Sequence, residues 1–299
     1  MNSAPKPSQH FVLNWSQQDP EAKWGFSSKK FTAVSNLTSF LLGLILTLLF
    51  YAALYPFHLM NKWQMVNMFF HGGPENRSTI PYYTVFLSCW CLAFLIIKAK
   101  KLALQKRALQ ISLVPDDAGS DFVISPMNAQ DILNSLSRQV LQVKDFMLLW
   151  RIECALRNLK NIGRVSDVSS LLSDLAEQDA NFVDSSYTLP KGLIWAIPVL
   201  GFIGTVLGLS QAVGGFGTVV ASGADLDALK GALGGVTGGL ATAFETTLIA
   251  LVAALIIQIF LTFLQQKEDA FLDDCASYCQ NQLTSRLKMV DILDQVEKF

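Results

Sequence analysis

The chain has 299 residues, of which 51% are hydrophobic and 16% are charged, and its formal net charge at pH 7 is −1. The large apolar share is typical of a membrane protein, so membrane-spanning segments are the first feature to look for. The nearly balanced charge gives no reason to expect nucleic-acid binding.

Four runs of the sequence predict membrane-spanning helices, because each is long and apolar enough to cross the roughly 30 Å hydrocarbon layer. The runs are Asn36–Phe57, Ile80–Ile97, Gly192–Val213 and Gly239–Leu264. Glu245, in the last run, is their only charged residue. We do not expect the first run to be a cleaved signal peptide. Residues 1–35 precede it, and it exceeds a signal-peptide core of roughly 7–15 apolar residues.

The distribution of basic residues predicts the orientation of these spans. Most of the 23 Lys and Arg residues flank the spans on one side, whereas the connections on the other side hold only Lys62, Arg77 and Lys230. Because basic residues favour the cytoplasmic side, both termini and residues 98–191 are expected in the cytoplasm. The expected fold class is an all-α membrane protein with four transmembrane helices and cytoplasmic helical extensions.

Five segments follow from this topology. Residues 1–35 form an N-terminal cytoplasmic segment, and residues 36–97 form a peripheral transmembrane hairpin, rich in Leu and Phe, that faces lipid. Residues 98–191 form a cytoplasmic helical region. Residues 192–266 form a second hairpin, rich in Gly, Ala and Thr, that lines an interior. Residues 267–299 form a C-terminal cytoplasmic helix.

The polar parts are expected to contain amphipathic helices joined by turns. The chain before Trp24 is expected to be flexible. The other expected elements are a turn at Val114–Gly119, a helix from about Asn128 to Asn161, a break at Asn161–Gly163, a helix at Ser166–Phe182, and a flexible external turn at Gly214–Gly235.

The residue chemistry does not indicate catalysis. None of the five cysteines is predicted outside the cell, so no disulfide framework is expected. Cys275 and Cys279 lie one helical turn apart, but no second pair or nearby His completes a metal site, which favours a buried apolar role. His10, His58 and His71 lie outside the predicted spans. Without a phosphate loop, nucleophile elbow or metal-ligand cluster, we expect no enzymatic activity, cofactor or bound metal.

Small residues line one face of each of the last two spans. Gly201, Thr205 and Gly208 share a face of the third span, and Gly204 with Gly208 forms a small-xxx-small pair. The fourth span has a similar stripe, made of Gly239, Ala243, Thr247, Ala250 and Ala254. Both stripes are suited to a common partner, with the Thr205 and Thr247 hydroxyls in an ion-linked seam. The alternative is that each hydroxyl bonds back to its own helix.

Two interpretations of Glu245 remain open. It forms a polar patch with Thr242 and Thr246, and it points about 160° away from Thr247, so it does not share that seam. As a functional group it would relay a proton or cation on another face. As a structural group it would lie near the outer interface, where water reaches it. Pro198, which lacks an N–H, is expected to kink the third span.

The segments IPVLGFIGTVLGL (Ile197–Leu209) and GGLATAFETTLIALVAAL (Gly238–Leu255) resemble the MotA/TolQ/ExbB proton-channel family. The four-span topology resembles the MotA branch, whereas the sequences of the last two spans are closer to the TolQ and ExbB branch. The resemblance implies a homopentamer in a bacterial inner membrane. It also implies two copies of a single-span MotB/TolR/ExbD-like partner that carries a titrating Asp. Flow of H⁺ or Na⁺ would then drive rotation of the ring relative to the partner.

The same resemblance assigns roles to individual residues. Thr205 matches the Thr of the family's GTV motif, and Thr247 matches the Thr that faces it on the last span, so both would lie beside the partner's Asp. Thr242 stands where TolQ and ExbB often carry a Glu, with Glu245 about one turn later. A structural membrane scaffold, built as the same ring without ion flux, is the alternative function. A self-contained transporter fits less well, because the two halves show no repeat symmetry.

Overall fold

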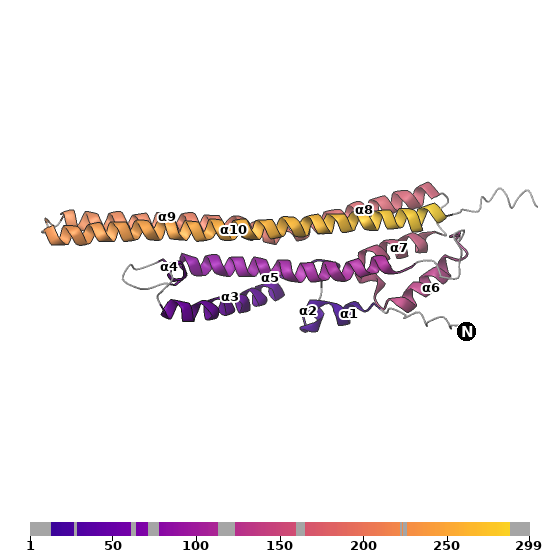
Figure 1. Cartoon of the computed structure of the whole chain (residues 1–299). Coiled ribbons are helices and arrows are strands. Elements are labelled where there is room, and N and C mark those ends of the chain that lie inside the picture. The colour runs from indigo at the N-terminus through magenta and orange to yellow at the C-terminus, as the bar shows by residue number, and fades with distance from the viewer. Residues whose placement is uncertain are drawn as a thin grey trace, which may run out of the picture. The chain divides into compact units, whose positions relative to one another are not determined.

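The computed structural model describes residues 13–26, 29–60, 64–70, 78–112, 123–159, 165–221, 223 and 226–287. This part of the chain is helical, and its only β-type pairings are two isolated bridges (Figure 1). The expected all-α class is therefore confirmed. The chain divides into two compact units. We call Asn36–Ile97 with Tyr187–Leu264 the membrane unit, and Met1–Ser35 with Lys98–Ser186 and Gln265–Phe299 the charged unit.

Four long helices contain the predicted spans, and each is long and apolar enough to cross a membrane. They are α3 (Asn36–Leu59), α5 (Ile80–Lys106), α9 (Thr188–Ala221) and α10 (Leu226–Gln282). All four extend beyond the predicted apolar runs. A short helix, α4 (Gln64–Asn67), follows α3. The prediction of four spans is confirmed.

Close packing joins α3 to α5. A Cβ on Gly43 would lie 2.6 Å from the Cα of Trp90, so only glycine permits this approach of the two backbones. The Trp90 indole donates a hydrogen bond to the Ser39 hydroxyl at 3.2 Å, and Phe40 contacts the Trp90 ring edge-on. His58 lies one residue beyond the predicted span, in the last turn of α3. It hydrogen-bonds Asn67 at 2.8 Å.

The glycine-rich stretch Gly214–Gly235 is helical over most of its length, so the prediction of a flexible turn was wrong. Helix α9 continues to Ala221 and α10 begins at Leu226. Between them, Gly223 has a left-handed φ of 64°, which suits a tight reversal. Glycine is a poor helix former in water. However, this preference is weak for a single residue and does not exclude a helix.

The charged unit consists of shorter elements. They are α1 (Trp15–Gln18), α2 (Pro20–Lys23), η1 (Arg107–Gln110), α6 (Ala129–Gln139), η2 (Val143–Asp145), α7 (Met147–Asn158), α8 (Val165–Ser186) and η3 (Thr284–Arg286), together with the polar ends of α5 and α10. Helix α8 agrees with the predicted Ser166–Phe182 helix. The predicted turn at Val114–Gly119 and the break at Asn161–Gly163 lie outside the described residues.

Two predictions in this unit were wrong for one reason. The expected helix from Asn128 to Asn161 is interrupted between α6 and α7, and residues 13–23, part of the segment expected to be flexible, contain α1 and α2. Leu13 pairs with Val140 at the interruption, since the Leu13 N–H donates to the Gln139 carbonyl and the Leu141 N–H donates to the Leu13 carbonyl, both at 3.1 Å. This tertiary pairing orders the amino-terminal segment and ends α6.

The cysteines of the described residues are free thiols. Cys89, Cys91, Cys275 and Cys279 are buried. Burial raises the pKa of the partly exposed Cys154 thiol, and the adjacent Glu153 carboxylate raises it further. Cys154 therefore stays protonated and weakly nucleophilic at neutral pH.

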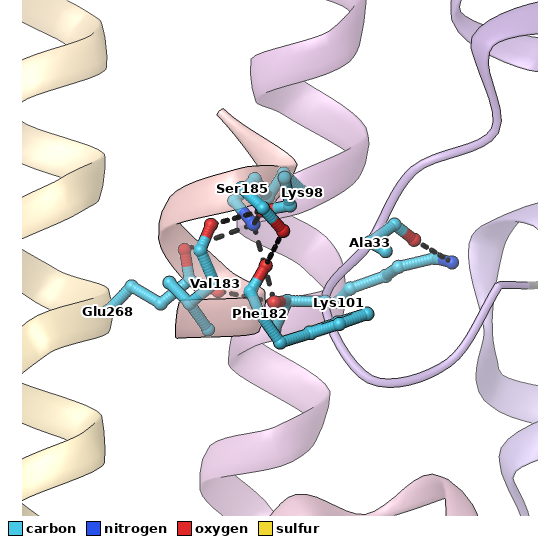
Figure 2. Close-up of polar contacts among 9 residues, drawn as sticks. Ala33, Lys98, Lys101, Phe182, Val183, Ser185 and Glu268 are labelled. Carbon is cyan, nitrogen blue, oxygen red and sulfur yellow. Dashed lines mark hydrogen bonds and ion pairs between the residues drawn. The ribbon is translucent and has the colours of Figure 1, made fainter. Parts of the chain in front are cut away.

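Two buried lysines connect the amino-terminal segment to the charged end of α5. The Lys101 ammonium lies 2.5 Å from the Glu21 carboxylate, 3.7 Å from Asp19 and 2.8 Å from the carbonyl of Ala33. Lys101, Glu21 and Asp19 are all fully buried. Such a pair is stable only when each charge retains its partners, because the desolvation of both ions is costly. The contact between Lys101 and Ala33 is visible in Figure 2.

Lys98, one turn earlier on α5, forms a second buried pair. Its ammonium lies 3.1 Å from the Glu268 carboxylate of α10 and 2.7 Å from the Ser186 hydroxyl of α8 (Figure 2). The Thr32 hydroxyl donates to the same carboxylate and lies 3.3 Å from the Lys98 ammonium. Together the two lysines hold residues 19–33 against α5, and we call these contacts the lysine clamp.

Lys101→Met should destabilise the charged unit, because it leaves the Glu21 carboxylate buried without its cation. Removing one partner of a buried ion pair costs about 3–5 kcal/mol. Backbone hydrogen exchange of residues 13–26 should therefore rise strongly in the full-length variant. Lys144→Met changes an exposed lysine elsewhere in the charged unit and should leave exchange unchanged. Unaltered protection in Lys101→Met would contradict the lysine clamp.

Candidate functional site

The hairpin of α9 and α10 holds the candidate site, and its two helices lie side by side (Figure 1). Their contact is a narrow seam of small residues. A Cβ added to Gly201 would lie 2.7 Å from the Ala250 side chain, and one added to Gly208 would lie 2.7 Å from the Gly239 carbonyl. A Cβ on Gly204 would collide with Thr246. The seam therefore packs α9 against α10 of the same chain.

Three threonines have distinct positions at this seam. The Thr247 hydroxyl donates across it to the Gly201 carbonyl at 3.0 Å and also lies 3.3 Å from the Ala243 carbonyl of its own helix. The buried Thr246 side chain faces Gly204 and donates to the Ala243 carbonyl at 3.0 Å. Thr205 is half-buried, and its hydroxyl bonds back to the Phe202 carbonyl at 2.6 Å. Thus Thr247 bridges the two helices, whereas Thr205 follows the alternative of bonding within its own helix.

The position of Thr246 differs from the sequence analysis, which grouped it with Glu245 on another face. Successive residues of a helix are rotated by about 100°, so an inward Thr246 directs Glu245 toward the edge of the seam. Glu245 is indeed half-buried, and Phe244 before it is exposed. Thr242, one turn earlier, is buried and bonds the Gly238 carbonyl at 3.0 Å. Of the three residues of the expected polar patch, Thr242 and Thr246 are therefore buried and Glu245 is half-buried.

Pro198 lies within α9 and does not end it. It cannot donate the hydrogen bond that the carbonyl four residues earlier would normally accept, which weakens the helix at this turn. Seam residues follow it directly, beginning at Gly201. On the described part of α9, the small and hydroxylated residues of the seam are what distinguishes it from a plain apolar span.

The outer faces of the hairpin are apolar and uncovered within this single chain. On α9 the exposed large side chains of the span are Phe202, Ile203, Val206, Leu207, Leu209 and Val213. On α10 they include Phe244, Leu248, Leu251, Val252, Leu255 and Ile256. These faces require lipid or further protein, because large apolar areas are not left in water.

Outside the connection near residues 225–230, the polar side chains of the hairpin are neutral hydroxyl and amide groups and one carboxylate. The sequence carries no charge from Gly192 to Ala224 and only Glu245 between Gly231 and Gln266. Threonine hydroxyls donate and accept hydrogen bonds but do not titrate near neutral pH. The described residues contain no group of three or more His, Cys, Asp or Glu side chains arranged for a metal ion. The hairpin can therefore solvate an ion or a neighbouring carboxylate, but it has little capacity to carry protons by itself.

Sequence reasoning missed the lysine clamp. Lys98 and Lys101 were interpreted only as charges that orient the spans, yet both side chains are fully buried. Their spacing of three residues, which places them on one helix face at the end of an apolar run, was the available signal. Their partners at Glu21 and Glu268 are too distant in sequence to be inferred without the fold.

Comparison with known families gives one match. Residues 152–276 match the model of the MotA/TolQ/ExbB proton channel family. This range includes α8, α9 and most of α10, and so contains the whole hairpin seam. No curated protein and no solved structure matches the chain.

Gly204→Val should weaken the hairpin, because the new side chain collides with Thr246 across the seam. Overpacking of this kind costs about 1–3 kcal/mol, so the full-length protein in detergent should melt at a lower temperature. Gly214→Val is the matched control in the same helix, since a Cβ there meets nothing within 4 Å. The two variants change the intrinsic helix propensity by the same amount, so an equal change in melting temperature would contradict the seam.

Proposed function

Because residues 152–276 match the model of the MotA/TolQ/ExbB proton channel family, we propose that the chain is the ring-forming subunit of an ion-driven motor. Five copies form the ring, and it surrounds two copies of a single-span partner that carries a titrating Asp. Flow of H⁺ or Na⁺ through the assembly drives rotation or another mechanical rearrangement. The family match over the α9–α10 hairpin carries this proposal. The proposal assigns the chain no enzymatic reaction and no cofactor.

The uncovered faces of the hairpin support a ring. The seam uses the small residues of α9 to pack α10 of the same chain, so contact with further subunits falls on large apolar side chains. Such side chains pack equally well against lipid or protein, and a ring satisfies both on opposite sides of each helix. The protein is a multi-pass membrane protein, and we place it in a bacterial inner membrane with both termini in the cytoplasm.

The threonines support a role beside a partner's carboxylate. Thr247 already holds a hydrogen bond between the helices, and Thr205 is half-buried with its hydroxyl near the surface of α9. An isolated carboxylate in a low-dielectric environment resists ionisation, and neighbouring hydroxyl donors offset part of this cost. Each elementary charge that crosses 100 mV releases about 2.3 kcal/mol, so a few ions suffice for a substantial rearrangement.

The purified full-length chain should assemble as a homopentamer. Native mass spectrometry in detergent should therefore detect a species of five copies of the 32.9 kDa chain. Co-purification with the product of a neighbouring reading frame, with one apolar span containing Asp, should add two smaller subunits to the five. A monomer or dimer as the largest specific species would contradict the ring.

Thr205→Val combined with Thr247→Val should reduce ion flux while leaving assembly intact. A hydrogen bond to a charged group contributes about 1.5–3 kcal/mol, so flux should fall by about tenfold to a hundredfold. Flux is measured in proteoliposomes that contain the chain and its partner, with acid-pulse and sodium-pulse arms that identify the ion. Thr205→Ser with Thr247→Ser retains both hydroxyls and should retain most of the flux.

The matched control for this experiment is Thr218→Val with Thr237→Val. It also removes one hydroxyl from each helix, but both hydroxyls are exposed and bond carbonyls of their own helix. This control should conduct normally. Full flux in the Thr205/Thr247 valine variant would contradict the assigned role. If the protein's cellular function also persisted after an uncoupler collapsed the gradient, the scaffold alternative would replace the motor.

A further inference from the structure

The charged unit contains a pocket of about 390 Å³, and every charged residue that lines it is basic. One wall comes from the amino-terminal segment, with Gln18, Pro20, Lys23 and Trp24. The other wall comes from α5 and η1, with Lys100 and Arg107 as its polar residues. No carboxylate lines the pocket. It lies wholly within the charged unit, so its walls belong to one compact part of the chain.

The three cations of this pocket have no partner in the part of the chain that the structure describes. The side chains of Lys23, Lys100 and Arg107 are exposed and make no ion pair or hydrogen bond there. The nearest acids in sequence, Asp19 and Glu21, are fully buried and paired with Lys101 of the lysine clamp. Three like charges around one hollow repel each other, so an anion bound there would be stabilised.

A second observation is the position of the pocket along α5. The apolar run of this helix ends at Ile97. With a rise of 1.5 Å per residue, Lys100 lies about 4.5 Å beyond that point and Arg107 about 15 Å beyond it. The headgroup layer on each side of a bilayer is roughly 5–8 Å thick. Lys100 therefore lies at headgroup depth, and the pocket extends from there away from the hydrocarbon.

Trp24 adds an independent indication of lipid. Its ring is 49% exposed at the edge of the pocket. An exposed indole beside basic residues is typical of the membrane interface, where its apolar ring and its N–H meet different environments. A site for a free phosphate or for an acidic peptide gives no reason for an exposed apolar ring at this point.

We propose that this pocket binds the phosphate group of an anionic phospholipid. Lys100 on α5, Arg107 on η1 and Lys23 on the amino-terminal segment donate to the phosphate oxygens, while Trp24 and Pro20 contact the glycerol region. The bound lipid thus links the amino-terminal segment to α5 at the protein surface, as the lysine clamp does in the buried interior. This inference does not depend on ion conduction or on a pentamer, because it uses residues of one chain at one end of a span.

The test uses the full-length protein in detergent, titrated with phosphatidylglycerol or phosphatidylcholine and followed by native mass spectrometry. The wild type should bind phosphatidylglycerol more tightly. Each basic residue near a membrane surface is worth about a fivefold change in affinity, so Lys100→Gln with Arg107→Gln should lower it about 25-fold. Lys23→Gln, on the opposite wall, should lower it about fivefold. Affinity for phosphatidylcholine should not change in either variant.

The matched control is Arg138→Gln with Lys144→Gln, which removes the same two charge types from exposed positions elsewhere in the charged unit. It should retain the affinity of the wild type. An equal loss in this control, or no preference for phosphatidylglycerol, would overturn the proposal. Displacement of the lipid by inorganic phosphate or by an acidic peptide would also overturn it, because the pocket would then belong to that ligand.

Discussion

The close approach of α9 and α10 is the constraint on which the membrane unit depends. Gly201, Gly204 and Gly208 leave no space for a Cβ, so the two backbones pack more tightly than larger side chains would allow. In lipid, apolar side chains gain little by leaving the acyl chains, and association relies on such packing and on hydrogen bonds between helices. The bond from Thr247 to the Gly201 carbonyl is one of these. The small residues therefore pack α9 against α10 of the same chain. The large apolar side chains on the outer faces remain available for contact with lipid or further protein.

In the charged unit, buried ionic groups hold the segments together, whereas the membrane unit relies on small uncharged residues. Lys98 and Lys101 follow directly after the apolar run of α5, yet they do not extend into water. Each ammonium is satisfied by groups from separate segments, and so each fixes how those segments meet. Buried ion pairs contribute little net stability, but a wrong arrangement would leave a charge unpaired. The lysine clamp therefore acts mainly on the specificity of the fold. It orders an amino-terminal segment that has few apolar residues of its own.

The sequence was sufficient for the features that depend on composition over a long window. Apolar runs predicted the four spans, because a helix that crosses a membrane needs about 20 apolar residues whatever it packs against. The interruption between α6 and α7 was not predictable in this way. It depends on pairing between Leu13 and Val140, which are far apart in the chain. That Thr246 faces Gly204 across the seam was also not predictable, because periodicity gives the faces of a helix but not which face meets the neighbour.

The neutrality of the hairpin seam follows from the symmetry of the proposed ring. A ring of five copies repeats every group five times, so a carboxylate in the seam would place five charges in a medium of low dielectric constant. Coulomb repulsion between them would be poorly screened there. Threonine hydroxyls avoid this cost, since they solvate an ion without carrying charge. The carboxylate that titrates is then best supplied once or twice by a partner and not five times by the ring. Glu245, half-buried at the edge of the seam, is the exception to this neutrality, because the proposed ring would repeat it five times.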